Sequence, residues 1–175
     1  GNMDSCSFTV TVIDNEEPVL NLPIDIVVCA DDTSGAVVDF ATITADDNCG
    51  VASITQSSNQ TSGSFFPIGT TTNTYTATDV NGNSSTESFT ITVVASPVAA
   101  FTASDACFGS AVLFTNNSTG GTDYFWDFGD GNTSIDANPG HLYAQPGVYT
   151  VTLTVTNPNT NCTNTYSLTV KVFDE

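Results

Sequence analysis

Positive charge is almost absent from this sequence. Its 175 residues contain one Lys or Arg against 19 Asp and Glu, which gives a net charge of −18. Nucleic acid and anionic membranes are therefore poor partners, because both require a basic protein face. The excess negative charge has two interpretations: a solvated, highly soluble surface, or clustered carboxylates that hold divalent cations.

Long apolar runs and good helix formers are also scarce. No stretch approaches the ~20 apolar residues of a membrane-spanning helix, so direct membrane insertion is not expected. Thr, Ser, Val, Asn and Gly dominate, which is typical of short strands joined by polar turns. A hydrophobic fraction of 39% is enough for packed cores.

The residues of common catalytic sites are missing as well. His141 is the only histidine, and the sequence has no nucleophile elbow, phosphate-binding glycine loop or HExxH motif. Its five cysteines are too widely spaced for a zinc site and indicate structural disulfides in an oxidising compartment. We therefore expect a secreted or cell-surface protein that is not an enzyme. Asp127 and Asp130 are interpreted as turn residues, with calcium ligation as the alternative.

An internal repeat indicates a tandem organisation. Residues 1–12 and 82–93 are identical at seven of twelve positions, with an offset of 81 residues. In the second copy Phe89, Ile91 and Val93 alternate with threonines, as in a half-buried strand. We predict that residues 1–17 are the last strand of a preceding module plus a linker, cut from a longer polypeptide.

The remaining alternating segments predict two further modules, residues 18–95 and 96–175. Strands are expected at 24–29, 36–43, 51–57, 71–78 and 89–93 in the first module, and at 98–103, 111–116, 124–128, 148–157 and 165–173 in the second. This spacing predicts an all-β protein of tandem immunoglobulin-like β-sandwich domains arranged end to end. The expected core residues are Phe40, Tyr75, Phe89 and Ile91 in the first module, and Trp126, Tyr149, Val151 and Leu153 in the second.

Several motifs in residues 18–95 resemble the hyalin repeat (HYR) family. They are DNEEP at 14–18, ADDNCG at 45–50, SGSFFPIGTTT at 62–72 and YTATD at 75–79, followed by Gly-Asn and Ser-Phe pairs. Leu22 and Glu87 stand where hyalin repeats often carry two cysteines. Cys6 keeps the second of these positions in the preceding, truncated repeat.

Residues 97–173 resemble the polycystic-kidney-disease (PKD) domain. The motifs are YFWDFGDGN at 124–132, HLY at 141–143 and PGVYTV at 146–151. The resemblance makes His141 a structural residue under the core. It also implies structural roles for a set that includes a core tryptophan and a tight turn with positive φ: Trp126, Asp127, Gly129, Asp130, Gly131 and Tyr149.

Related repeats carry similar cysteine pairs, and one pair per module implies two disulfides here. These are Cys107–Cys162 in the second module and Cys29–Cys49 in the first, with Cys6 unpaired. Strand counting places Cys107 near the opposite end of its module from Cys162. That pairing therefore requires the first strand to kink or cross over.

Alternating strand directions place three acidic segments at one end of the first module. They are the entering linker, the loop between the second and third strands, and the last hairpin loop. Calcium takes about 6–8 oxygen ligands, so we expect it as a cofactor here. The best candidate ligands are Asp14, Glu16, Asp46 and Asp79, followed by Asp47, Asn48, Asn81 and Asn83. The alternative is that these Asp and Asn residues only form turns.

The combination of hyalin repeats with PKD domains resembles giant surface adhesins of Bacteroidetes, some of which act in gliding motility and are exported by type IX secretion. The resemblance implies a non-catalytic stalk or adhesive module at the extracellular cell surface. Its partners would be neighbouring repeats of the same chain, and surface glycans or proteins. The alternatives are an accessory region of a secreted hydrolase, or a matrix or surface-layer protein.

Overall fold

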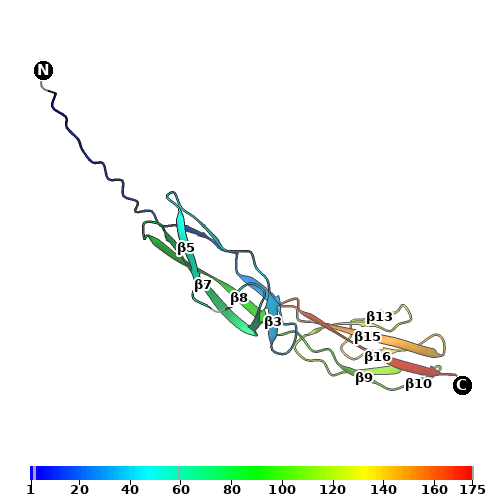
Figure 1. Cartoon of the computed structure of the whole chain (residues 1–175). Helices are drawn as coiled ribbons and strands as arrows, with labels where there is room; N and C mark the ends of the chain where they lie inside the picture. Colours follow the sequence, from blue (N-terminus) through cyan, green and yellow to red (C-terminus); the bar gives the residue numbers. More distant parts are fainter. Residues whose placement is uncertain (2, 59, 175) are drawn as a thin grey trace. The chain divides into compact units, whose positions relative to one another are not determined.

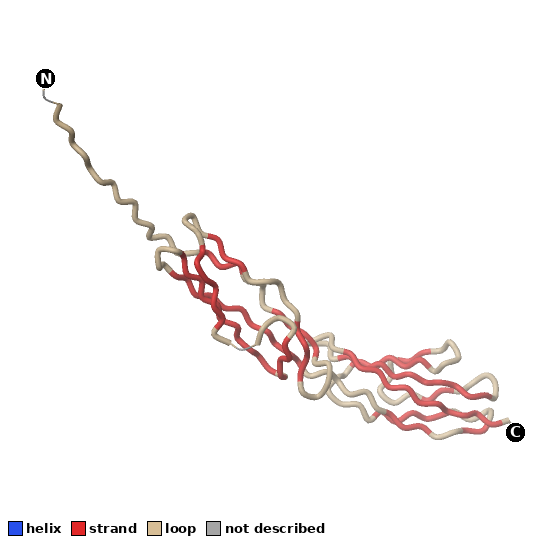
Figure 2. Tube along the Cα trace, viewed as in Figure 1, coloured by secondary structure: helices blue, strands red, loops and turns tan. Residues whose placement is uncertain are grey.

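The computed structural model describes residues 1, 3–58 and 60–174. Over these residues the regular secondary structure is entirely strand, β1 to β16, and no helix is present (Figure 1, Figure 2). None of the described residues belongs to a helix that could cross a membrane. The all-β class predicted from the composition is confirmed.

The chain divides into two compact units. Unit 1 contains Gly1–Ile26, Asp39–Ser64 and Thr71–Ile91, and unit 2 contains Val27–Val38, Phe65–Thr70 and Thr92–Glu175. Two short segments from the first half of the chain therefore group with the second half.

The strands of the first half form one larger sheet and two small ones. The larger sheet has the order β2-β8-β7-β5, and the small ones pair β1 with β4 and β3 with β6. From β1 to β7 each successive strand changes sheet, and β7 and β8 then lie side by side in the larger sheet, which is the connectivity of a β-sandwich. The strands are β1 (Val19–Asn21), β2 (Ile26–Cys29), β3 (Gly35–Val38), β4 (Thr44–Asp46), β5 (Val51–Gln56), β6 (Ser64–Pro67), β7 (Gly69–Asp79) and β8 (Ser84–Val94).

The alternation seen in the sequence of β8 corresponds to a buried and an exposed face. Phe89, Ile91 and Val93 are buried, and Phe40 packs edge-on against Phe89 with a centroid distance of 5.2 Å. On the outer face, hydroxyl groups of Thr and Ser pair between β7 and β8. Thr74 bonds Ser88 at 2.9 Å and Thr76 bonds Thr86 at 2.8 Å. Such cross-strand pairs stabilise the exposed side of the sheet.

The second half contains a five-stranded sheet, β10-β16-β15-β12-β13, and a three-stranded sheet, β14-β11-β9. Its longest element is the β15–β16 hairpin, paired from Gly147↔Val172 to Thr156↔Thr163. The strands are β9 (Phe101–Ala103), β10 (Ala106–Cys107), β11 (Val112–Asn116), β12 (Asp123–Asp127), β13 (Thr133–Ser134), β14 (Gly140–His141), β15 (Gly147–Thr156) and β16 (Thr163–Phe173).

Trp126 lies at the centre of the core of the second half. It is 0% exposed, and the rings of Phe101 and Phe114 pack against it at 5.0 and 5.5 Å. Of the eight core residues predicted from sequence, six are buried, whereas Phe40 and Tyr149 are only partly buried. Both exceptions still pack through their rings, on Phe89 and Tyr143 respectively.

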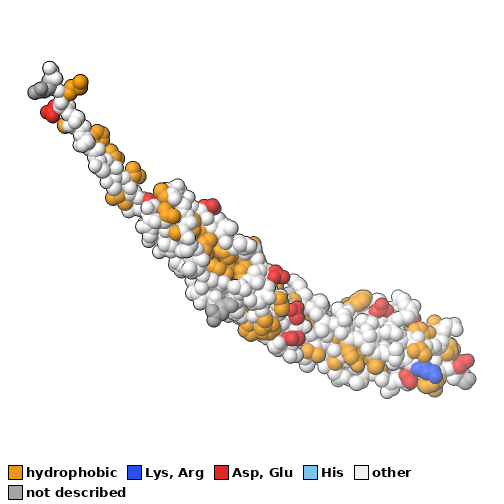
Figure 3. Space-filling view, viewed as in Figure 1, with side chains coloured by type: hydrophobic (Ala, Val, Ile, Leu, Met, Phe, Trp, Pro, Cys, Tyr) orange, Lys and Arg blue, Asp and Glu red, His pale blue; other side chains and the backbone are white. Residues whose placement is uncertain are grey.

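The strand of a preceding module predicted within residues 1–12 is not formed in the part of this segment that the structure describes. The described residues 3–17 contain no strand (Figure 2). Hydrophobic atoms lie at the surface of this N-terminal segment (Figure 3). Phe8, Val10 and Val12 are 88%, 71% and 90% exposed. A strand is held by ladder hydrogen bonds to a neighbour, and no described strand pairs with this segment. Alternation alone therefore did not produce a strand.

The strand predicted at residues 36–43 is also corrected, because β3 ends at Val38 and a separate strand, β4, begins at Thr44. The interruption has a local cause at Phe40. Its backbone amide donates to the Ser62 hydroxyl at 2.8 Å, and that hydroxyl donates to the Phe40 carbonyl at 2.9 Å. A side chain thus replaces the ladder partner that a continuous strand would need.

Candidate metal centre and disulfide

Three aspartates converge within unit 1. Asp14 precedes β1, Asp47 follows β4, and Asp79 is the last residue of β7. One carboxylate oxygen from each lies within 4.8 Å of the other two. These three residues are called the Asp cluster below.

Asp79 is the buried member of the Asp cluster, with 2% exposure. Its Oδ1 accepts hydrogen bonds from the backbone amides of Asn81, Gly82 and Asn83 at 2.9, 2.6 and 2.8 Å. Its Oδ2 accepts from the Asn83 side chain at 2.7 Å. Burial by itself raises the pKa of Asp79, but these hydrogen bonds outweigh it and hold the pKa below its ordinary value. Asp79 is therefore negatively charged at neutral pH.

Asp47 has one satisfied and one unsatisfied carboxylate oxygen. Oδ1 accepts from the backbone amides of Cys49 and Gly50, both at 2.9 Å, which closes the turn after β4. Oδ2 is buried and has no hydrogen-bond partner among the described residues. A buried polar atom without a partner is costly, so this oxygen is a candidate ligand for a cation.

Asp14 connects the segment before β1 to the β7–β8 hairpin. Its Oδ2 accepts from the Asn81 side chain at 2.9 Å, and its main-chain carbonyl accepts from the Asn83 side chain at 3.3 Å. Its Oδ1 accepts from the backbone amide of Glu16 at 3.1 Å. The three acidic segments expected at one end of the module are therefore joined in the structure.

Of the five acidic residues predicted as ligands, three form the cluster, which contains Asp47 and not its neighbour Asp46. The Asp46 carboxylate accepts from the Asn21 side chain at 2.8 Å, across the β1–β4 pair. Asp46 is the last residue of β4, whereas Asp47 lies in the turn that follows, so the two carboxylates have different surroundings. Glu16 accepts a hydrogen bond from the Asn48 side chain, outside the Asp cluster.

Cys49, which the sequence analysis assigned to a disulfide, is a neighbour of the Asp cluster. Its hydrogen bond with Asp14 raises the pKa of the Cys49 thiol, and burial and the charges of Asp14, Asp47 and Asp79 raise it further. The group therefore stays a neutral thiol beside the carboxylates. The motif ADDNCG shows the proximity of Cys49 to Asp47, but only the fold brings Asp14 and Asp79 to it.

The Asp cluster has the chemistry of a site for a hard divalent cation. All of its charged groups are oxygen donors, which Ca²⁺ and Mg²⁺ prefer, and the unpartnered Asp47 Oδ2 is free to serve as a ligand. The residues present thus fit calcium, with Asp14, Asp47 and Asp79 as candidate ligands.

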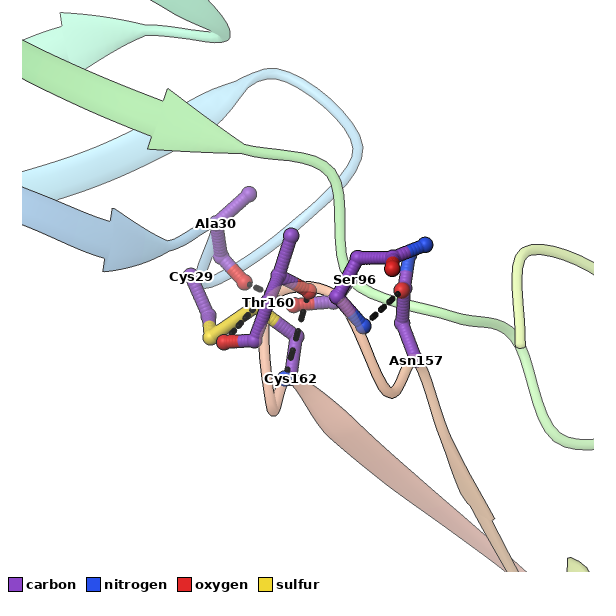
Figure 4. The surroundings of a disulfide bond; sticks show 7 residues. Cys29, Ala30, Ser96, Asn157, Thr160 and Cys162 are labelled. Atoms are coloured by element: carbon purple, nitrogen blue, oxygen red, sulfur yellow. Dashed lines mark hydrogen bonds between the residues drawn. A yellow bond between two sulfur atoms is a disulfide. The ribbon is translucent and has the colours of Figure 1, made fainter. Parts of the chain in front are cut away.

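The disulfide differs from both predicted pairs, because the structure joins Cys29 to Cys162 (Figure 4). Cys6, Cys49 and Cys107 are free. Cys107 pairs in parallel with Phe173, the last residue of β16, whereas Cys162 immediately precedes the first. An 11-residue strand spans roughly 35 Å, so Cys107 cannot reach Cys162. Cys29 and Cys49 fall in different compact units.

The loop between β15 and β16 presents Cys162 to Cys29. The Asn157 amide donates to the Cys162 carbonyl at 2.9 Å, and the Asn161 amide donates to the Asn157 carbonyl at 2.8 Å. Asn161 adopts φ 57°, a left-handed conformation that Asn tolerates better than most residues. Beside the disulfide, the Ser96 hydroxyl donates to the Ala30 carbonyl at 2.8 Å (Figure 4).

The predicted tight turn after β12 is confirmed. Gly129 and Gly131 adopt φ values of 78° and 91°. Asp127 Oδ1 accepts from the Gly129 amide at 2.9 Å, and Asp130 Oδ1 accepts from the Asn132 amide at 3.0 Å. These are turn-forming contacts, in agreement with the first interpretation of the two aspartates.

His141 is a structural residue. Its ring stacks on Phe128 at 4.1 Å and meets Tyr143 edge-on at 4.5 Å, while Nε2 lies 2.7 Å from Asp130 Oδ2. Burial raises the pKa of Asp130, but the His141 and Asn132 hydrogen bonds and the His141 charge reverse the effect and lower it. Tyr149 is anchored nearby, since its hydroxyl donates to the Gln145 carbonyl at 2.8 Å.

The fold and the sites together define a protein of consecutive all-β modules. Residues 13–93 match the family model of the HYR domain, and residues 94–172 match that of the PKD domain. The chain therefore contains one HYR and one PKD domain, both of which are non-catalytic domains.

Three similar proteins illustrate these matches. Hyalin of Lytechinus variegatus is 41% identical over 98 residues, which is 54% of this chain and 18% of hyalin. Collagenase ColA of Bacillus cereus is 62% identical over 32 residues, which is 18% of this chain and 3% of the collagenase. The PKD1 domain of Vibrio anguillarum Epp is 37% identical with a TM-score of 0.41, covering 46% of this chain and 96% of that one. The chain thus spans less than a fifth of the length of these curated relatives.

Proposed function

We propose that the chain is a non-catalytic stalk or adhesive segment of a large bacterial cell-surface adhesin. The observation that carries the proposal is the succession of an HYR and a PKD domain, with a disulfide between residues contributed by each. Such a disulfide persists in an oxidising environment, which is consistent with an extracellular location. The partners would be neighbouring repeats of the same chain, and glycans or proteins on the contacted surface.

Gliding motility is the setting proposed for this adhesin, with export by type IX secretion. The net charge of −18 supports a surface that stays soluble and does not bind nucleic acid. A second candidate is an accessory region of a secreted hydrolase, which the similarity to collagenase ColA favours.

The experiment that separates the two candidates removes residues 13–172 from the parent protein in its own cells. The adhesin proposal predicts that the shortened protein still reaches the cell surface, while attachment to glass and gliding speed fall. Fluorescent antibody against the parent measures surface display, and microscopy measures attachment and speed. If attachment is unchanged and degradation of a secreted-hydrolase substrate falls instead, the adhesin proposal is wrong.

We also propose that calcium occupies the Asp cluster and stiffens the entry into the HYR domain. Three carboxylates within 4.8 Å of one another repel, and the repulsion favours separation of the segment before β1 from the two loops. A dication between them removes that repulsion. An extracellular site can have a Kd on the order of 0.1–1 mM and still be filled.

The calcium proposal is tested by calorimetric titration and by thermal unfolding with excess calcium or chelator. Because binding to the folded state stabilises it, calcium at a hundredfold excess over Kd should add about 2.7 kcal/mol to the free energy of unfolding. Asp47→Asn should abolish the heat of binding. The matched control is Asp46→Asn, which removes the same charge one residue away and should bind calcium like the wild type. Identical melting of the wild type in both buffers, with no heat of binding, would mean that the loops are only turns.

A further inference from the structure

We infer that, when the two ends of the chain are pulled, the Cys29–Cys162 disulfide transmits the force directly between β2 and β16. Residues 30–161 then carry no tension and do not extend. The two cysteines are 133 residues apart in sequence, and the bond closes all of that chain into a loop. Strands β3 to β15 lie inside the loop, whereas β1, β2 and β16 lie outside it. Force applied at the ends therefore passes through the two sulfur atoms.

The disulfide joins the end of one strand outside the loop, β2, to the beginning of another, β16. Cys29 is the last residue of β2, and Cys162 immediately precedes the first residue of β16. Tension thus leaves one strand, crosses the disulfide and enters the other strand without an intervening flexible segment. A strand already rises about 3.3 Å per residue, so it has almost no slack to release.

The second strand on this path is held along its whole length. β16 pairs with β15 through ten consecutive residue pairs and with β10 at its far end. Force enters β16 at its first residue and leaves at its last, so it acts along the strand and does not peel it from β15. Trp126 itself lies inside the disulfide loop and is therefore not on the path of the load, whereas Val170 and Val172 of β16 belong to the same core and are on it.

By contrast, the N-terminal part of the path is weak. β1 is held to β4 by only three residue pairs, and residues 3–17 belong to no strand and are held by side-chain contacts such as Asp14 with Asn81. The first extension under load is accordingly expected there, before any element inside the disulfide loop. The contour length that the disulfide withholds from extension follows from the loop size. A sequence separation of 133 residues corresponds to roughly 450 Å of fully extended chain.

Reduction is the condition that would release the loop. Cys29 is exposed, whereas Cys162 is 1% exposed. A small thiol or phosphine reductant therefore reaches the bond at the Cys29 sulfur, and the hidden length becomes available only in reducing conditions. The response of the isolated chain to force does not depend on whether the parent protein is an adhesin. Either proposal can therefore fail while the other stands.

The test is single-molecule force spectroscopy of the full chain, with handles fused to the two ends. In oxidising buffer, complete stretching should extend only the 28 residues before Cys29 and the 13 after Cys162. With tris(2-carboxyethyl)phosphine, and in the Cys29→Ser/Cys162→Ser variant without reductant, the final contour length should increase by roughly 450 Å. Contour length at full stretch does not depend on whether the variant folds.

The matched control is Cys49→Ser/Cys107→Ser, which removes two free thiols and leaves the disulfide intact. It should keep the short contour length of the oxidised wild type. Full extension of the oxidised wild type, or a short contour length in the Cys29→Ser/Cys162→Ser variant, would overturn the inference.

Discussion

At the scale of single residues, the indole of Trp126 has the largest predicted effect on stability. It is fully buried between Phe101 and Phe114, and its Nε1 donates to the Asp136 carbonyl at 2.9 Å. Trp126→Ala should lower the free energy of unfolding by about 3–5 kcal/mol, because it leaves a cavity. Urea denaturation followed by circular dichroism measures the change. Phe125→Ala is the control: this ring is 48% exposed, and its loss should cost much less.

A second residue-scale prediction concerns acid. The pKa of Asp130 in the folded protein is lowered, despite burial, by hydrogen bonds from His141 and Asn132. The unfolded value is about 3.9. The charged group therefore stabilises the fold above pH ~4, and this contribution is lost as the pH falls through the folded-state pKa. Asp130→Asn should be less stable than the wild type at pH 7, and the gap should close in acid. A gap that stays constant from pH 7 to pH 2 would contradict this account.

At the scale of elements, the turn between β12 and β13 depends on its first glycine. A Cβ at position 129 would lie 2.4 Å from the Thr150 carbonyl oxygen, and the residue has φ 78°. Gly131 has a similar φ of 91°, but open space around it. Gly131→Ala should therefore cost roughly 1–2 kcal/mol from backbone strain alone. Gly129→Ala should cost clearly more, because β15 must also move. Equal melting temperatures for the two variants would show that the close approach to Thr150 is unimportant.

At the scale of the whole molecule, the disulfide is the main covalent constraint on folding. Closing a loop of this size restricts the unfolded chain, which stabilises the folded state by roughly 4–5 kcal/mol in the chain-entropy description. Cys29→Ser/Cys162→Ser should therefore melt at a markedly lower temperature than the wild type. Cys49→Ser/Cys107→Ser should melt near the wild type, since both thiols are free. Calorimetry under non-reducing conditions compares the three proteins, and equal melting temperatures would argue against this constraint.

Much of the fold could be read from local patterns. The alternation of Phe89, Ile91 and Val93 predicted their burial, and the Gly129-Asp130-Gly131 motif predicted a turn with positive φ. The same reasoning was wrong for residues 8–12, which alternate equally well but have no partner strand among the described residues. Periodicity reports which face a strand would bury, and pairing decides whether the strand forms.

The sequence by itself determined the all-β class, the burial of Trp126 and the acidic segments near Asp14, Asp47 and Asp79, because each depends on residues close together in the chain. Only the tertiary structure decided that Asp47 rather than Asp46 joins the Asp cluster. It also decided that Cys29 pairs with Cys162. Both outcomes depend on distances between segments remote in sequence: a carboxylate belongs to the cluster, and a cysteine forms a disulfide, only where the fold brings its partner within reach.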